Sequence, residues 1–219
     1  MVIPDALLAE FRAYIADRGA GSTPRVPLIV EFLFRPEGLG MVYRHDATFT
    51  VAEAYRERTA NCLTFTLLTV ALARAVGYQA YGQQIARSLD WRREGDTVYR
   101  SIHVNAGVRL GQRRVSVDVA WDQVITGDPP LRIGDARLLA HYYNNRMVEL
   151  MRIDQLDAAR LYADQSLALD PEYATSWSNL AVLEQRSGQP AMAERDNHDD
   201  HPHILYPRDY PIITNAIAP

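Results

Sequence analysis

The sequence is poor in covalent and membrane-anchoring features, and it contains a single cysteine, Cys62, among 219 residues. One cysteine cannot form an internal disulfide, and zinc sites built from cysteine pairs are excluded. No segment is apolar enough to cross a membrane, because Thr69 and Arg74 interrupt even the longest apolar run. The residues after Met1 also lack the basic start and apolar stretch of a secretory signal. We therefore expect a cytoplasmic protein without a membrane span, although a truncated exported protein would share these features.

A strong excess of one charge is absent as well. The chain carries 23 basic and 27 acidic residues, so neither nucleic acid nor an anionic membrane surface is an expected partner. Hydrophobic residues make up 47% of the chain, which is ordinary for a packed globular protein. The length suits one domain or two small ones. We expect neither a cofactor nor a resident metal ion.

Cys62 lies where a polar stretch turns into a long apolar one. Residues 62–76 read CLTFTLLTVALARAV and are apolar on nearly every side, which predicts a buried helix that ends at Gly77. Thr59 or Asn61 supplies the N-cap oxygen. Cys62 then lies in the first turn, where free N–H groups and the helix dipole stabilise a thiolate. Taken alone, however, a single cysteine fits equally well as a small buried hydrophobic residue.

Shorter patterns precede this helix. Residues 5–17 carry their apolar side chains on one side and predict an amphipathic helix. Thr50 and Glu53 have the spacing of a capping box, which predicts a helix start. The prolines at the two ends of 24–27 are expected to bracket a loop. The apolar residues 30–34 after it fit either a strand or a short helix.

Two alternating segments further along predict a β-hairpin. Residues 102–108 and 113–119 alternate between apolar and polar side chains, and Leu110–Gly111 serves as a two-residue turn. This register places His103 directly opposite Asp118, close enough for an imidazole N–H to reach a carboxylate. A slip of one residue would move the two side chains to opposite faces. The polar face is either an ordinary solvated surface or the wall of a site.

A cysteine at a helix start, a histidine and an aspartate form the set of groups that nucleophilic thiol chemistry needs. In this interpretation Asp118 orients His103, which takes the proton of the Cys62 thiol and later protonates the leaving amine. Asp122 is an alternative third member, but it follows the end of the strand, and Asp118 is preferred. The predicted catalytic residues are therefore Cys62, His103 and Asp118.

These motifs resemble those of bacterial transglutaminase-like domains in the papain-like superfamily. The resemblance lies in Arg58–Phe65, in 71–81, in Ser101–Asn105 and in Val117–Asp118, in the family's order. It covers about residues 45–125. Family members usually carry glycine where this chain has Ala60, and an alanine there requires a negative φ.

The resemblance implies an α+β fold with the cysteine at the start of a buried helix packed on an antiparallel sheet. It also implies acyl transfer through a thioester on a peptide or protein substrate, by hydrolysis or by amide exchange onto an amine. The backbone N–H of Cys62 is one expected oxyanion donor, and Gln83 or Gln84 is a candidate for a side-chain donor. The alternative function is a non-catalytic adaptor that uses the same fold for protein interaction.

The region after residue 139 resembles tetratricopeptide repeats, which have a 34-residue period and small residues where helices cross. Ala159 and Ala193 are one such period apart, and Pro171 ends the first repeat. An unrelated helical hairpin with coincidental alanines is the alternative. These observations predict a transglutaminase-like domain over 1–138 and helical repeats over 139–194, with a possible protein partner bound by the repeats.

The remaining residues, 195–219, are predicted to form an irregular tail, because prolines in it prevent a regular helix. Its first part contains four residues of metal-ligating types: His198, Asp199, His201 and His203. This cluster suits a metal ion, but a solvated polar run is the preferred interpretation, and no metal site is predicted.

Overall fold

The computed structural model describes residues 2–18, 25–85, 91–94, 97–100, 102–119, 129–188 and 212–214. Helices and sheets are both present, which confirms the expected α+β class at that level. The chain divides into two compact units. The first unit comprises 1–85, 104–123 and 130–133, and the second unit comprises 86–103, 124–129 and 134–219.

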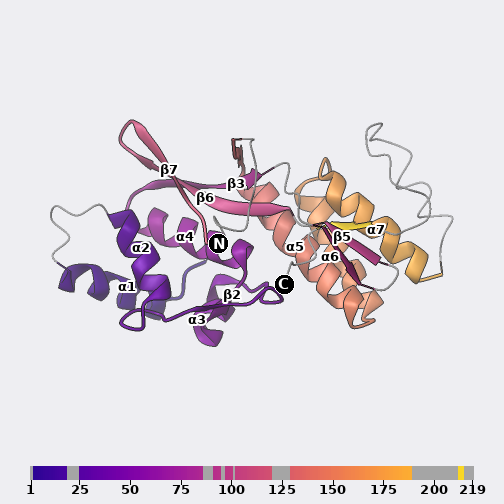
Figure 1. Ribbon diagram of the computed structural model, residues 1–219, viewed down its shortest axis with the longest axis horizontal. Helices are drawn as coiled ribbons and strands as arrows, with labels where there is room; N and C mark the ends of the chain where they lie inside the picture. The colour runs from indigo at the N-terminus through magenta and orange to yellow at the C-terminus, as the bar shows by residue number, and fades with distance from the viewer. Residues whose placement is uncertain are drawn as a thin grey trace. The chain divides into compact units, whose positions relative to one another are not determined.

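Four helices belong to the first unit: α1 (Asp5–Asp17), α2 (Arg25–Phe34), α3 (Val51–Glu57) and α4 (Cys62–Ala75) (Figure 1). The sequence predicts α1 with these bounds, and its buried side chains are Leu7, Phe11, Tyr14 and Ile15. Helix α4 begins at Cys62 as expected, and Gly77 follows it with φ +88°, the left-handed conformation that ends helices. Its middle is buried from Leu63 to Ala73, so α4 is the central helix of this unit.

Helix α2 corrects one expectation and decides between two alternatives for another segment. Pro27 lies in the first turn of α2 rather than at the end of a loop, and the apolar residues 30–34 are helical. A proline is tolerated in the first turn because the N–H groups there have no partner within the helix. The side of α2 that faces the core contributes Ile29, Phe32 and Leu33, which are at most 1% exposed.

The predicted capping box at the start of α3 is confirmed. The Thr50 hydroxyl accepts from the Glu53 backbone N–H at 3.3 Å, and the Glu53 carboxylate accepts from the Thr50 N–H at 2.8 Å. Arg58 ends the helix in the left-handed region with φ 53°. Ala60 follows in a strand and has no positive φ, so an alanine fits where transglutaminase-like domains carry glycine.

A four-stranded sheet has the order β7-β6-β3-β8. Its strands are β3 (Gln79–Ile85), β6 (His103–Leu110), β7 (Arg113–Val117) and β8 (Leu131–Ile133). Helix α4 packs against β3, and the Thr66 hydroxyl of α4 donates to the Val104 carbonyl of β6 at 3.3 Å. A second, two-stranded sheet joins β1 (Val42–Tyr43) to β2 (Thr59–Ala60) in parallel.

The β6–β7 hairpin forms, but its register differs from the predicted one. Ala106 pairs with Val117 rather than with Val115, and the turn is Gly111–Gln112, where Gly111 has φ +60°. The predicted turn at Leu110–Gly111 is therefore wrong, and so is the direct opposition of His103 and Asp118. Because the shift is two residues, every side chain keeps its predicted face.

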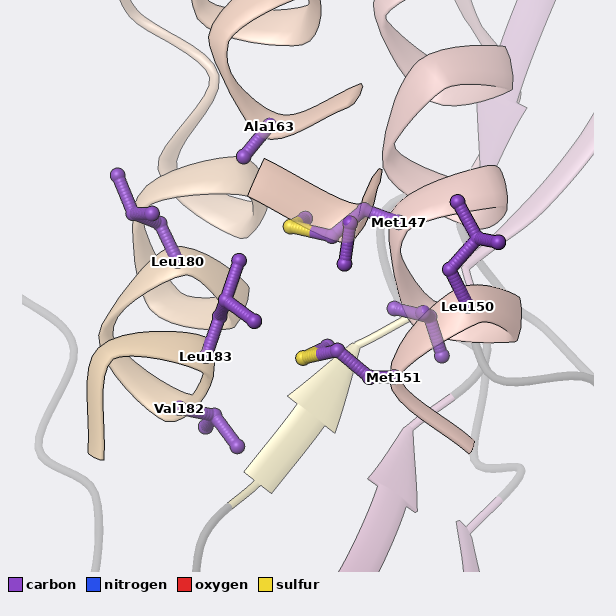
Figure 2. Close-up of a cluster of buried hydrophobic side chains, with 9 residues drawn as sticks. Met147, Leu150, Met151, Ala163, Leu180, Val182 and Leu183 are labelled. Atoms are coloured by element: carbon purple, nitrogen blue, oxygen red, sulfur yellow. The ribbon is translucent and has the colours of Figure 1, made fainter. Parts of the chain in front are cut away.

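The second unit contains three helices among its described residues: α5 (Asp135–Arg152), α6 (Leu156–Leu169) and α7 (Ala174–Arg186). They pack side by side around the buried cluster shown in Figure 2. The labelled members of the cluster are Met147, Leu150, Met151, Ala163, Leu180, Val182 and Leu183. This unit also includes a sheet of β4 (Trp91–Glu94), β5 (Thr97–Arg100) and β9 (Ile212–Thr214).

A buried polar network lies between α5 and α7. The Tyr173 hydroxyl and His141 Nδ1 are 2.6 Å apart. Asn144 Oδ1 accepts from Asn179 Nδ2 at 2.9 Å and from the Ser176 hydroxyl at 3.3 Å. Buried polar groups that find such partners avoid the cost of desolvation, so the network holds the two helices in one relative position.

The helices fall where the repeat pattern predicts them, and Ala159 is fully buried in the cluster between α5 and α6. Ala193, the second crossing position, lies outside the described residues, so assignment to the tetratricopeptide family stays a prediction. Helix α5 runs without a break through the predicted domain boundary at 138/139. Of the predicted tail, the described part is strand β9, and His198, Asp199, His201 and His203 lie outside it. Within the described ranges, no helix is both long and apolar enough to cross a membrane.

Candidate functional site

The start of α4 is fixed by its N-cap, Asn61. The Asn61 side-chain oxygen accepts from the Thr64 backbone N–H at 2.9 Å, and its amide donates to the Thr48 hydroxyl at 2.7 Å. Asn61 is 2% exposed, whereas Cys62 beside it is half-buried. Between the two predicted N-cap candidates, the structure selects Asn61 over Thr59. The cap holds Cys62 in the first turn with its side chain open to solvent on part of its surface.

A loop from residues 44 to 49 is bound along the start of this helix. The Asn61 N–H donates to the Ala47 carbonyl at 3.2 Å, and the Phe49 N–H donates to the Thr64 hydroxyl at 2.9 Å. The Thr64 hydroxyl in turn donates to the Ala47 carbonyl at 3.0 Å. These bonds join the backbone on both sides of Cys62 to a segment fourteen to seventeen residues earlier in the sequence.

Tyr43 is placed next to Cys62 by the short parallel ladder. Tyr43 pairs with Ala60, two residues before the cysteine, and the Arg44 N–H donates to the Ala60 carbonyl at 3.0 Å. The Tyr43 ring is parallel to the Phe65 ring, with an interplanar angle of 2° and centroids 6.4 Å apart. The His45 ring meets it edge-on at 4.9 Å. Main-chain pairing and two ring contacts thus fix the orientation of this phenol.

The Tyr43 hydroxyl interacts with Cys62 itself. Burial raises the pKa of Tyr43 most, and the proximity of the Cys62 side chain raises it further. A hydrogen bond with the Cys62 backbone lowers this pKa, and the charge of Asp118 raises it. The net pKa lies well above the ordinary value, so Tyr43 keeps its proton at physiological pH. Cys62, Tyr43 and Asp118 therefore share one electrostatic neighbourhood.

Asp118 follows the last residue of β7 and is held by Asn105. Asn105 Nδ2 donates to Asp118 Oδ2 at 2.8 Å. Asn105 is 4% exposed, and its Oδ1 is buried without a hydrogen-bond partner among the described residues. The carboxylate identifies which end of the Asn105 amide is nitrogen, because an oxygen there would face another acceptor. Across the hairpin, the Asn105 amide is thus one partner of the Asp118 carboxylate.

His103 is the first residue of β6, and the boundary between the two units falls directly after it. Its side chain is 5% exposed. Because side chains alternate along a strand, His103 lies on the same face of β6 as Asn105. This face is not an ordinary solvated surface, which was one of the two expectations, because β6 is buried from His103 to Val108. The role of His103 as a base stays a prediction.

The two glutamines considered as oxyanion donors lie in β3, as expected. Gln83 is buried, and its Oε1 accepts from the Ser116 hydroxyl at 2.9 Å across the sheet. Gly107 of the intervening strand makes room for this contact, because a Cβ there would lie 2.9 Å from the Gln83 side chain. This hydrogen bond joins the Gln83 amide oxygen to β7 of the same sheet. Asp122, the alternative third member of the triad, lies outside the described residues.

Sequence reasoning did not identify Tyr43 or Asn105 as members of the site. Tyr43 lies 19 positions before Cys62, in a strand of two residues that is too short to show alternation. The predicted register puts Asn105 on the correct face of the strand, but opposite Ser116 rather than next to Asp118. The one available signal was its position two residues after His103, which assigns both side chains to the same face.

The chain was compared with protein families, curated proteins and solved structures. None of the three comparisons finds a match. The resemblance to transglutaminase-like domains therefore depends on the residue patterns alone, and it stays a prediction.

Proposed function

We propose that this chain is a thiol-dependent acyl-transfer enzyme that acts on amide bonds of a peptide or protein. The observation that carries the proposal is the environment of Cys62. Cys62 is a partly exposed residue in the first turn of a buried helix, its side chain lies near the hydroxyl of Tyr43, and the charge of Asp118 contributes to the raised pKa of that hydroxyl. A structural cysteine needs only apolar packing, whereas a nucleophile needs access, an oriented polar neighbour and the free N–H groups of a helix start.

In the proposed reaction Cys62 Sγ attacks the carbonyl carbon of the substrate, and the thiol proton passes to His103. The C=O electron pair moves onto the oxygen and returns when the C–N bond breaks. His103 gives its proton to the departing amine, which leaves a thioester on Cys62. Water or a second amine then attacks the thioester and regenerates the thiol. Asp118 stabilises the charged form of His103, and Asn105 positions the Asp118 carboxylate.

The composition allows hydrolysis and amine transfer to be distinguished cleanly. All 23 basic residues are arginines, so the chain contains no lysine. The protein therefore has no ε-amine of its own that could accept the acyl group. A fluorescent primary amine supplied with an acylating probe would compete only with water, and its incorporation into the released product measures transfer directly.

The test uses two reagents on the full chain. Iodoacetamide labelling at about pH 6 should modify Cys62 roughly ten- to a hundredfold faster than free cysteine, because a free thiol is almost fully protonated there. p-Nitrophenyl acetate should release p-nitrophenolate in a burst and leave an acetyl group on Cys62, detected by mass spectrometry. Cys62→Ala should abolish both signals.

Two histidine variants identify the base. His103→Gln should lower both rates by at least about tenfold. His45→Gln removes one of the ring contacts of Tyr43 and should lower the rates less than His103→Gln does. The reverse pattern would assign the base to His45 and overturn the proposed triad. A wild-type thiol that labels no faster than free cysteine and forms no acyl adduct would favour the adaptor function instead.

A further inference from the structure

We propose that the Tyr43 hydroxyl is the side-chain donor that binds the substrate's carbonyl oxygen, together with the backbone N–H of Cys62, while Cys62 attacks. This inference rests on the acyl-transfer function proposed above and adds a catalytic residue to it. An oxyanion site needs donors that are already oriented toward the place where negative charge develops.

The structure holds the phenol where such a donor is needed. Tyr43 is bound through its backbone to the segment that enters α4, since its strand pairs with Thr59–Ala60. The Phe65 ring, one helical turn after Cys62, lies parallel to the phenol and restricts rotation of the ring about its side-chain bonds. Phe65 is itself fixed by the ring of Phe34, with centroids 4.6 Å apart. The hydroxyl therefore keeps its position when a substrate enters.

The position of the hydroxyl suits an incoming carbonyl oxygen. The pairing of Tyr43 with Ala60 and its ring contact with Phe65 bring this side chain to the first turn of α4, where its hydroxyl interacts with Cys62. When Sγ attacks, the sulfur loses its charge and the carbonyl oxygen gains it. The O–H bond of Tyr43 then turns from the sulfur to that oxygen, while the direction of the Cys62 N–H stays fixed by the helix. No proton is transferred in this step.

The protonation state of Tyr43 suits this role. Its raised pKa keeps the hydroxyl neutral over the working range of pH, so it retains the proton that it would donate. Tyr43 combines a donor proton that can turn about the C–O bond with a position at the first turn of α4.

Tyr43→Phe tests the proposal because it removes one oxygen and keeps the ring. Acetylation by p-nitrophenyl acetate passes through a tetrahedral oxyanion, whereas alkylation by iodoacetamide is a displacement at a saturated carbon and forms none. The ratio of the two rates therefore reports on the oxyanion donor and cancels changes in the thiol itself. We expect this ratio to fall about a hundred- to a thousandfold in Tyr43→Phe.

Tyr55→Phe is the matched control. It removes a tyrosine hydroxyl that donates to Glu10 at 2.8 Å, and it should leave the ratio unchanged. If both rates of Tyr43→Phe fall by the same factor, or neither falls, Tyr43 is not the donor, although the acyl-transfer function stands. A wild-type protein that forms no acetyl adduct overturns the function and this inference together.

Thermal melting of Tyr43→Phe shows whether the variant is folded. If it is not, Phe65→Leu is measured in its place, because this change removes the ring that restrains Tyr43 and leaves the hydroxyl. The ratio should then fall several-fold. An unchanged ratio in Phe65→Leu would overturn the inference.

Discussion

The two units each bury a cluster of polar side chains, and the clusters differ in how their groups are paired. In the second unit His141 pairs with Tyr173, and Asn144 accepts from two donors of α7. In the first unit the cysteine is half-exposed, and a buried oxygen of Asn105 has no partner among the described residues. Asn145 Oδ1 of α5 is also buried without a hydrogen-bond partner among the described residues, but Asn145 is not a member of the network between α5 and α7.

A buried polar cluster can hold helices together or can leave groups available to a ligand, and the pairing of its hydrogen bonds distinguishes the two cases. A network whose hydrogen bonds are all internal stabilises one packing arrangement of its helices. A cluster with a free acceptor and an accessible sulfur has unused hydrogen-bonding capacity, which a substrate or water can occupy. Three experiments test this distinction.

The largest expected effect comes from acid and the second cluster. His141 is 1% exposed, and burial, followed by the charge of Arg137, lowers its pKa to about 3. The unfolded state, with a histidine pKa of about 6.5, therefore takes up the proton first as the pH falls. This contribution to stability is complete above about pH 6.5, and it decreases by about 1.4 kcal/mol per pH unit toward pH 3.

Urea unfolding of the wild type and of His141→Gln between pH 7 and pH 4 measures this term as a difference in slope. The variant should lack it, while iodoacetamide labelling of Cys62 at pH 7 stays unchanged. If the free energy of unfolding has the same pH slope in both proteins, burial does not keep His141 neutral in the folded state.

An intermediate effect distinguishes the two buried asparagines. Asn105→Ala leaves the Asp118 carboxylate without its amide donor, which should cost about 1.5–3 kcal/mol of stability. It should also slow acetylation by about tenfold or more, because the carboxylate loses its fixed position. Asn179→Ala removes one of the two donors to the Asn144 oxygen, which should cost about 0.5–1.5 kcal/mol, and it should leave the acetylation rate unchanged. A similar effect of both variants on acetylation would remove the distinction between the clusters.

The smallest effect concerns the helix caps of the first unit. Thr50→Ala removes half of the capping box of α3 and should cost about 1 kcal/mol of stability. Asn61→Ala should cost more, about 2 kcal/mol, since Asn61 also donates to Thr48. Chemical unfolding measures both costs. Only Asn61→Ala should change the labelling rate of Cys62, and an equal change in Thr50→Ala would show that the cap has no special relation to the thiol.

Local signals made the helices predictable. The apolar side of α1, the capping box of α3 and the Asn61–Gly77 limits of α4 each depend on residues a few positions apart, and the sequence records them directly. Pro27 was misassigned because a proline has the same appearance in a loop and in the first turn of a helix, and only the surrounding packing distinguishes the two.

The partners of His103 and Asp118 were not predictable in the same way. Alternation has a period of two, so a register shifted by two residues preserves every face and leaves no trace in the pattern. Gly111 belongs to both possible turns, and only the structure shows that Leu110 still pairs with Arg113. The position of Tyr43 beside Cys62 could not be predicted, because a two-residue parallel ladder joins segments that no periodic signal connects.

Arg58 connects the first helix to the segment that leads into Cys62. Its left-handed conformation would suit glycine, but its guanidinium lies 3.6 Å from the Glu10 carboxylate of α1 and covers the Tyr55 ring of α3 at 4.7 Å. Replacing it by glycine would relax the backbone and remove one contact between α1 and the segment that leads into Cys62, while the hydrogen bond from Tyr55 to Glu10 would remain. The amino-terminal helix is therefore linked to the entry of α4, and a truncation that removes Glu10 should change the setting of a thiol more than fifty residues later in the sequence.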